Sequence, residues 1–318
     1  MILPWLLSGL GLVILLLAGD ALVKGAVNLS LRLGIPALIV SLTIVAFGTS
    51  APELLISIKA ILDDVPGLAL GNVVGSNTAN ILLVLGVPAL LATMHTSECN
   101  TRKTYNFMIT ASLLFIALAF RGVFDWIAGL ILLSALGYVL FDAFRDAHSH
   151  RRACRNDDPD EEVEGADPEM PGWRIAVFLV LGMIGLPLGA SLLVDNATII
   201  ARAYGISDTV IGLTLVAIGT SLPELATTVM AALRRQADVA LGNVIGSNMF
   251  NLLAIIGIAS LVGPINVDPE FLRFDLWVML AASLLLIPFV YFRRDITRVW
   301  GIVLVVLYVV YLIVVLTV

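Results

Sequence analysis

Two glutamates lie inside apolar stretches of the chain, each at the end of the same short motif. Gly48-Thr-Ser-Ala-Pro-Glu53 recurs as Gly219-Thr-Ser-Leu-Pro-Glu224. A carboxylate inside a bilayer is costly and by default indicates function, and neither stretch has an interior Lys or Arg to neutralise it. The matched acids therefore indicate a cation site where two halves of the chain meet.

A second motif repeats at the same displacement of 171 residues, which separates position 53 from 224 and position 71 from 242. Gly71-Asn-Val-Val-Gly-Ser-Asn77 recurs as Gly242-Asn-Val-Ile-Gly-Ser-Asn248. In a helix, Ser76 shares a face with Asn80, which follows four residues later, and the second copy repeats this pair. Glycines spaced by four let neighbouring backbones approach closely. The motif adds hydroxyl and amide oxygens to those of the glutamates.

The prolines of the first motif predict a break in each helix that carries a glutamate. Pro52 has no N–H and its ring crowds the carbonyl of Gly48, and Pro223 has the same relation to Gly219. The break frees carbonyls about one turn before each acid. In lipid, free carbonyls are tolerated only where something such as a bound cation satisfies them.

The resulting ligand set is all oxygen, which suits hard cations such as Ca²⁺ and Na⁺ and not Zn or Cu. Two carboxylates balance one divalent ion, or else two or more monovalent ions or protons. A single site that accepts either set, but not both, has the chemistry that an exchanger needs.

The composition places these motifs in a membrane protein. The chain has 318 residues, of which 59% are hydrophobic and 13% charged, with a mean hydropathy of +1.02. This excludes a soluble class, and no basic face indicates nucleic-acid binding. The two cysteines, Cys99 and Cys154, show no metal-ligand spacing and are expected as free thiols. The membrane lipid is the expected environment, and we expect neither a cofactor nor an obligate protein partner.

We predict an all-α polytopic membrane protein with ten transmembrane helices. The apolar runs lie at residues 2–31, 37–62, 68–92, 106–120, 123–141, 173–203, 209–233, 239–262, 274–292 and 296–318. The repeat displacement maps the second run onto the seventh and the third onto the eighth. Because each half then holds five helices, an odd number, the two repeats are expected to be inverted. We expect the second, third, seventh and eighth helices to be broken or kinked around a central ion site.

This division gives three segments. Residues 1–141 form the first five-helix repeat, with its motif region at 37–92; residues 173–318 form the second, with its motif region at 209–262. Residues 142–172 form an acidic linker. Thirteen Lys and Arg flank the loops on one side of the membrane and four flank those on the other, which predicts a cytoplasmic linker and outside termini. The pair His148 and His150 in the linker is interpreted as part of a solvated segment rather than a metal-binding tract.

The first and sixth helices are the longest, so we expect them to tilt steeply and to be the elements that move. Asp20 and Lys24, four residues apart in the first helix, are expected to neutralise each other. Asp195, which aligns with Lys24 across the repeat, has no local partner in the sequence.

The paired GTSxPE and GNxxGSNxxN segments resemble the two alpha repeats of the cation/calcium exchanger superfamily, specifically its prokaryotic sodium/calcium-exchanger-like antiporters. The resemblance covers nearly the whole chain. It implies that Glu53 and Glu224 ligate Ca²⁺ together with the main-chain carbonyls of two threonines, Thr49 and Thr220. It also implies Na⁺ sites built from four serines and two alanine carbonyls, with two asparagines at the remaining corners: Ser50, Ser221, Ser76, Ser247, Ala46, Ala217, Asn80 and Asn251.

Some members of the superfamily carry Asp at one of the last two positions, and in the potassium-dependent branch that acid is tied to K⁺ use. Here both positions are Asn, which argues against K⁺ co-transport. The favoured function is a secondary antiporter, not an enzyme, that exchanges Ca²⁺ for Na⁺ by alternating access across a bacterial or archaeal cytoplasmic membrane. Ca²⁺/H⁺ antiport, an intramembrane di-acid hydrolase and a passive channel are the alternatives.

Overall fold

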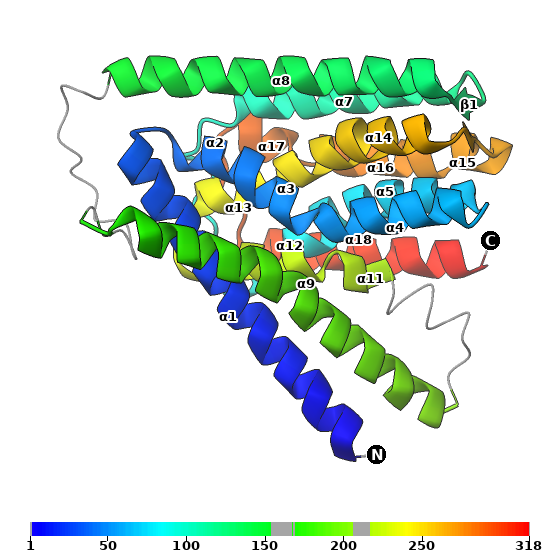
Figure 1. The fold of residues 1–318 in the computed structure, drawn as a ribbon, viewed down its shortest axis with the longest axis horizontal. Helices are drawn as coiled ribbons and strands as arrows, with labels where there is room; N and C mark the ends of the chain where they lie inside the picture. The colour runs from blue at the N-terminus through cyan, green and yellow to red at the C-terminus, as the bar shows by residue number, and fades with distance from the viewer. Residues whose placement is uncertain (1, 154–166, 168, 206–216, 318) are drawn as a thin grey trace.

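The computed structural model describes residues 2–153, 167, 169–205 and 217–317. Within these ranges the chain is helical apart from one pair of short strands, and most helices run along a common direction (Figure 1). The first half contains α1 (Ile2–Leu33), α2 (Ala37–Val40), the π-helical η1 (Ser41–Val45), α3 (Ala46–Thr49), α4 (Ala51–Leu62), α5 (Pro66–Ala79), the π-helical η2 (Asn80–Val84), α6 (Gly86–Leu91), α7 (Arg102–Ala119), β1 (Val123–Phe124) and α8 (Trp126–Ala153).

The second half repeats this pattern. It contains α9 (Gly172–Ala203), α11 (Ala217–Thr220), α12 (Leu222–Leu233), α13 (Ala237–Met249), the π-helical η5 (Phe250–Ile255), α14 (Ile256–Val262), β2 (Ile265–Asn266), α15 (Pro269–Arg273), α16 (Asp275–Leu284), α17 (Ile287–Tyr291) and α18 (Arg298–Thr317). The strands β1 and β2 pair antiparallel, with Val123 opposite Asn266, and link the two halves at one end.

Seven helical stretches of the described residues are long and apolar enough to cross a bilayer. The pair formed by residues 37–49 and 51–62, bent by 43°, makes an eighth. Two further predicted spans are helical without meeting this measure by themselves: α7, and the pair α11 and α12. The start of the predicted seventh span, residues 209–216, lies outside the described residues.

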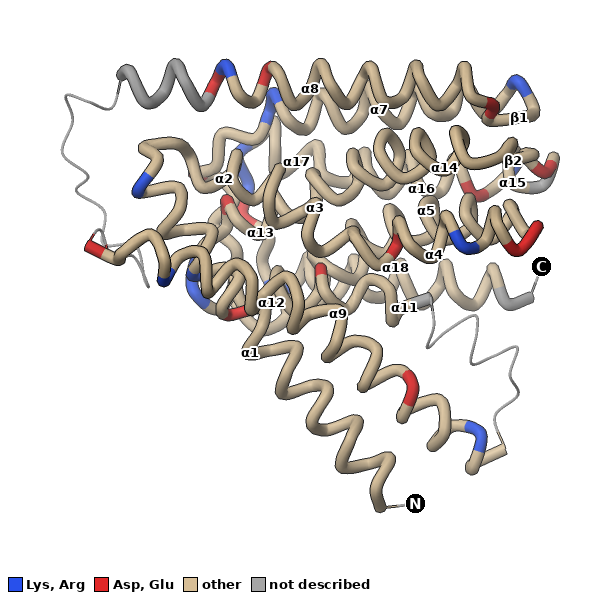
Figure 2. The backbone as a smooth tube through the Cα atoms, viewed as in Figure 1, with Lys and Arg blue, Asp and Glu red and all other residues tan. Residues whose placement is uncertain are grey.

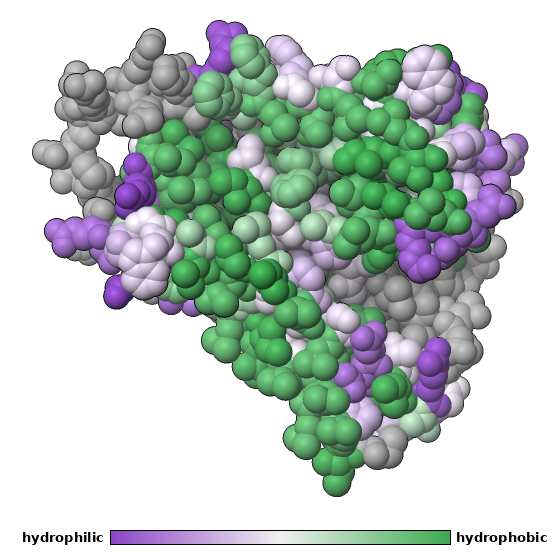
Figure 3. All heavy atoms as spheres, viewed as in Figure 1, coloured by the Kyte–Doolittle hydropathy of each residue, from purple (hydrophilic) through white to green (hydrophobic). Residues whose placement is uncertain are grey.

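The surface agrees with a lipid environment. Large apolar side chains such as Trp5, Phe141, Leu188 and Val306 are exposed on the outer helices. Figure 3 shows an apolar band, and Figure 2 shows Lys, Arg, Asp and Glu mostly at the two ends of the helix bundle. An apolar surface this extensive is foreign to soluble monomers.

The helices α1 and α9, each of 32 residues, cross the rest of the bundle obliquely (Figure 1). At about 1.5 Å per residue, each is much longer than a bilayer core is thick, which agrees with the tilt expected for the first and sixth helices. They pack backbone to backbone: a Cβ added to Gly11 would lie 2.6 Å from the Leu193 nitrogen, and one added to Gly182 would lie 2.5 Å from Leu22 Cβ.

One predicted helix end is wrong, and one end of the predicted linker contacts α1. The fifth helix does not end at residue 141, because α8 continues to Ala153. The far end of the predicted linker is also attached: the Asp167 N–H donates to Asn28 Oδ1 at 2.8 Å, and Arg32 donates to the Met170 carbonyl at 3.3 Å. The side chains of the linker histidines lie outside the described residues.

The third and eighth spans are not broken in the way that the second and seventh are. The helix is continuous over Pro66–Leu91 and over Ala237–Val262. Within each span, one turn is π-helical, at Asn80–Val84 and at Phe250–Ile255. A π-helical turn widens the helix locally without ending it, and such turns are frequent at functional sites.

Candidate ion-binding site

The two proline motifs break their helices at equivalent serines. Ser50, between α3 and α4, has φ −86° and ψ 5°, and Ser221, between α11 and α12, has φ −88° and ψ 3°. Each following helix therefore begins inside the bundle, and its first turn carries Glu53 or Glu224. The positive end of the helix dipole favours a carboxylate at this position. Both glutamates are only 1% exposed, so neither faces lipid.

Residues from both halves surround Glu224. The Ser50 hydroxyl, from the first half, donates to Glu224 Oε1 at 3.2 Å, and Ser247 on α13 donates to the same oxygen at 3.5 Å. The hydroxyls of Thr49 and Ser247 lie 3.4 Å apart. The structure thus brings together the polar residues of the two motifs.

One asparagine amide bonds to the backbone at each acid. Asn243 Nδ2 donates to the Glu224 carbonyl at 3.3 Å and to Thr228 Oγ1 at 3.1 Å. Asn72 Nδ2 makes the equivalent contacts, to the Glu53 carbonyl at 3.5 Å and to Ser57 Oγ at 3.4 Å. These bonds join α13 to α12 and α5 to α4 at the level of the acids.

A reciprocal network of asparagines lies beside the acids. Asn77 Nδ2 donates to the Asn248 carbonyl at 3.1 Å, and Asn248 Nδ2 donates to the Asn77 carbonyl at 3.3 Å. Asn80 Nδ2 donates to Asn248 Oδ1, and Asn251 Nδ2 donates to Asn77 Oδ1, both at 3.0 Å. The four bonds form two matched pairs. In each pair, the second bond joins the residues that are equivalent, in the other half, to those of the first.

The site concentrates buried oxygens that lack hydrogen-bond partners. Across the described residues, seven buried side-chain atoms have no such partner. Five of them are oxygens of the predicted site residues, namely Glu53 Oε2, Glu224 Oε2, Asn80 Oδ1, Asn251 Oδ1 and Ser221 Oγ. A buried polar oxygen without a partner is costly, and a cation is the ligand that would satisfy a group of oxygens without donors.

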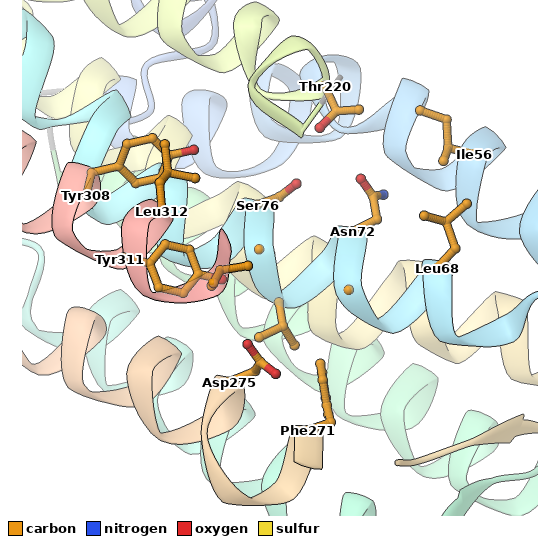
Figure 4. A pocket seen from close by; sticks show the side chains of 14 residues that line it. Ile56, Leu68, Asn72, Ser76, Thr220, Phe271, Asp275, Tyr308, Tyr311 and Leu312 are labelled. Atoms are coloured by element: carbon orange, nitrogen blue, oxygen red, sulfur yellow. The ribbon is translucent and has the colours of Figure 1, made fainter. Parts of the chain in front are cut away.

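The first-half side of the site borders a cavity of about 350 Å³. Figure 4 shows that Asn72 and Ser76 from α5 and Thr220 from α11 line it, together with apolar side chains that include Leu68 and Leu312. Ser76, although only 4% exposed, makes no side-chain hydrogen bond within the described part of the chain. This side thus borders a cavity, whereas on the other side Ser50 bonds to Glu224 and Thr49 lies beside Ser247.

Comparison with known proteins identifies the family of the chain. The model of the family described as "Sodium/calcium exchanger protein" matches residues 3–144 and 174–317. The chain belongs to this family. Its relatives are exchangers and antiporters rather than enzymes, which removes the hydrolase alternative.

Two curated relatives match over nearly the full length. The chain is 36% identical to the sodium/calcium exchanger MaX1 of Methanosarcina acetivorans, over 96% of each chain. It is 34% identical to the inner membrane protein YrbG of Escherichia coli, over 90% of this chain and 88% of that one.

Solved structures of the sodium-calcium exchanger NCX_Mj also match. The structure soaked with 10 mM Na⁺ and zero Ca²⁺ has a TM-score of 0.80 and 32% identity, over 97% of each chain. The chain is therefore a multi-pass membrane protein with the fold of this exchanger family.

The expectation of a free main-chain carbonyl does not hold at Ala46. Its carbonyl was expected to be free after the helix break, but it accepts hydrogen bonds from the Ser50 N–H at 3.0 Å and from Thr49 Oγ1 at 3.2 Å. In the second half the Ser221 N–H instead donates to the Ile218 carbonyl. Ala217 is the first residue of α11, and its side chain is not among those that the structure describes.

The charged residues of the long helices are partnered. Asp20 pairs with Lys24 at 3.0 Å, as expected, and also with Arg234 at the end of α12 at 2.5 Å. Asp195 has a local partner that the sequence analysis missed, because Ser191 Oγ donates to Asp195 Oδ2 at 3.0 Å.

Four further polar residues of the site were not predicted from the sequence. Asn77 and Asn248 lie within the repeated motif and hold the two π-helical turns together. Ser57 and Thr228 lie four residues after the glutamates, a helical spacing that could have identified them.

Proposed function

We propose that the chain is a secondary antiporter that exchanges Ca²⁺ for Na⁺ by alternating access. The observation that carries the proposal is the group of unpartnered buried oxygens around Glu53 and Glu224. Carboxylate, amide and hydroxyl oxygens are the ligands that hard cations prefer. Because both acids are buried and form no ion pair with a Lys or Arg among the described residues, whichever ions bind there supply the balancing charge.

The ligands divide by chemistry. Glu53 and Glu224 hold Ca²⁺ with the main-chain carbonyls of Thr49 and Thr220. The remaining predicted residues serve Na⁺ or close the shell, namely Ser50, Ser221, Ser76, Ser247, Asn80, Asn251 and the carbonyl of Ala217.

The proposed architecture is ten transmembrane helices in two inverted five-helix repeats, separated by a cytoplasmic linker. It is supported by the reciprocal asparagine bonds, which are the pattern of a pseudo-two-fold axis, and by the two ranges of the family match, one in each half. The excess of Lys and Arg on one side supports outside termini. The inner-membrane relative in Escherichia coli supports the cytoplasmic membrane as the location.

Alternating access is supported by the unequal surroundings of the two acids. Polar side chains from both halves cover Glu224, whereas Ser76 and Thr220 on the other side line a cavity. If the covered side and the cavity side of the site changed places, the cavity would open toward the opposite face of the membrane. The helices α1 and α9, which pack closely on each other through glycines, are the proposed moving element.

The test is flux in reconstituted vesicles. Proteoliposomes loaded with Na⁺ should take up ⁴⁵Ca²⁺ after dilution into Na⁺-free buffer, and Glu53→Gln or Glu224→Gln should abolish the uptake. Glu98→Gln, which makes the same chemical change at an exposed position, is the matched control and should retain it. Full activity in both site variants would refute the assignment.

Ca²⁺/H⁺ exchange is the second candidate. It is favoured by the complete burial of two carboxylates, which protons can neutralise as well as metal ions can. A pH jump across the vesicle membrane without Na⁺ separates the two: Ca²⁺ flux under this condition would support protons as the counter-ion, and its absence would support Na⁺.

A further inference from the structure

A third acid lines the cavity that borders the ion site. Asp275 is the first residue of α16 and is half-buried, and it lies along the same cavity as Asn72, Ser76 and Thr220 (Figure 4). The cavity walls near it are apolar or aromatic. They include Phe271 on α15 and three residues of α18, Tyr308, Tyr311 and Leu312.

The charge of Asp275 is not neutralised locally. Over the described ranges, no Lys or Arg forms an ion pair with it, whereas Asp20 and Asp125 each have such a partner. Low-dielectric walls around a single charge concentrate its field within a cleft. A cation in this cavity is therefore attracted to the Asp275 carboxylate.

We propose that Asp275 forms an additional cation-binding position in this cavity, which a divalent cation occupies on its way to Glu53 and Glu224. The inference rests on the proposed exchange function and deepens it. The polar atoms of the cavity support the route: Ser76 Oγ has no hydrogen-bond partner among the residues described and points into the cavity (Figure 4). The tyrosine rings add aromatic faces, which attract cations.

A purely structural role for Asp275 makes a different prediction. An acid in the first turn of a helix stabilises the helix dipole, so its removal would lower stability without a specific effect on Ca²⁺. A role as a cation position predicts a change in the concentration dependence of transport, because one unit of negative charge is lost beside the route.

The transport test compares Asp275→Asn with Asp268→Asn. Asp268 is exposed at the same end of the molecule and does not line the cavity, so it controls for the loss of charge. In right-side-out and everted membrane vesicles, we expect Asp275→Asn to raise the KM for Ca²⁺ about fivefold in one orientation only, with Vmax retained. The KM should also depend less on ionic strength than in the wild type. Equal KM values for the two variants, or an equal rise in both orientations, would overturn the proposal.

A binding test does not require transport. In the Glu53→Gln/Glu224→Gln double variant, Tb³⁺ bound at Asp275 should be sensitised by Tyr311, and the additional change Asp275→Asn should remove this luminescence while Asp268→Asn preserves it. Unchanged luminescence after Asp275→Asn would contradict the proposal. If Asp275→Asn fails to fold, Asp275→Ser keeps a residue suited to a helix N-terminus and serves in both tests.

The two failures can be told apart. If the glutamate variants retain exchange, the proposed function fails whatever Asp275 does. If they lose exchange while Asp275→Asn behaves like Asp268→Asn, only the inference about Asp275 fails.

Discussion

At the scale of single residues, the same side chain has different partners in the two halves. Ser50 Oγ donates to Glu224, whereas its equivalent, Ser221 Oγ, is buried with no hydrogen-bond partner in the described structure. The two serines have nearly identical backbone angles, so the difference arises from their surroundings rather than from the helix break.

This difference gives a matched pair of substitutions. Ser50→Ala should lower the free energy of unfolding by about 1 to 2 kcal/mol, because a buried hydrogen bond to a carboxyl group is lost. Ser221→Ala should have almost no effect, since it removes an oxygen without a partner. Melting temperatures in detergent without Na⁺ or Ca²⁺ would compare them, and equal losses would contradict the different hydrogen bonding.

The site residues were predictable from the sequence because their chemistry is unusual for a membrane span. Glu53, Glu224 and the serines of both motifs all lie in the buried cluster. Asn77 and Asn248 were missed as members of the network because each bonds to a residue 171 positions away, and such a pairing follows from the fold rather than from local spacing. Asp275 was missed because an acid at the start of a helix has an ordinary capping interpretation.

At the scale of elements, helix breaks were predictable where the covalent structure enforces them. Proline removes a donor, and both breaks occur at the predicted motifs. The sequence gives no such indication of the π-helical turns in the third and eighth spans. These turns begin at or next to Asn80 and Asn251, whose hydrogen bonds reach the other half of the chain. The predicted end of α8 was too early. The apolar run indicates only where the helix leaves the lipid, and the helix itself continues beyond that point.

The glycines of the second motif differ in the same way as the serines. A Cβ added to Gly246 would lie 2.6 Å from both the Leu42 carbonyl oxygen and Ala46 Cβ, whereas a Cβ added to Gly75 would have no neighbour within 4 Å. In α13 the glycine is required for close packing. In α5 the equivalent glycine lines the cavity.

We therefore expect Gly246→Ala to destabilise the protein by about 1 to 3 kcal/mol, because backbone atoms would have to shift. Gly75→Ala should not lower the melting temperature, because the added Cβ meets open space and alanine favours a helix more than glycine does. Thermal denaturation of both purified variants is the measurement. A loss of stability in Gly75→Ala equal to that in Gly246→Ala would mean that both faces are equally packed.

At the scale of the whole molecule, two copies of one motif pair are placed in unequal environments. Their shared sequence explains the reciprocal asparagine bonds, but it cannot indicate which half faces the cavity. The segment equivalent to residues 37–45 in the second half, at 208–216, lies outside the described residues. Among the described residues, the two halves differ in the contacts of Thr49 and Ser50. They also differ in the packing of α5 and α13 at Gly75 and Gly246.

The proposed competition of two ions for one site predicts how the stability of the whole protein depends on those ions. Because a ligand that binds only the folded state stabilises it by RT ln(1 + [L]/Kd), Ca²⁺ at one hundred times its Kd should add about 2.7 kcal/mol to the free energy of unfolding. In the proposed exchange the charge of the two carboxylates is balanced either by Ca²⁺ or by Na⁺, so Na⁺ should shift the midpoint of this Ca²⁺ titration to higher concentration. Glu224→Gln should reduce the Ca²⁺ stabilisation strongly, and Glu98→Gln should leave it intact. A Ca²⁺ midpoint that does not move with Na⁺ would mean that the two ions bind at separate sites, and charge balance at the glutamates would then not couple their transport.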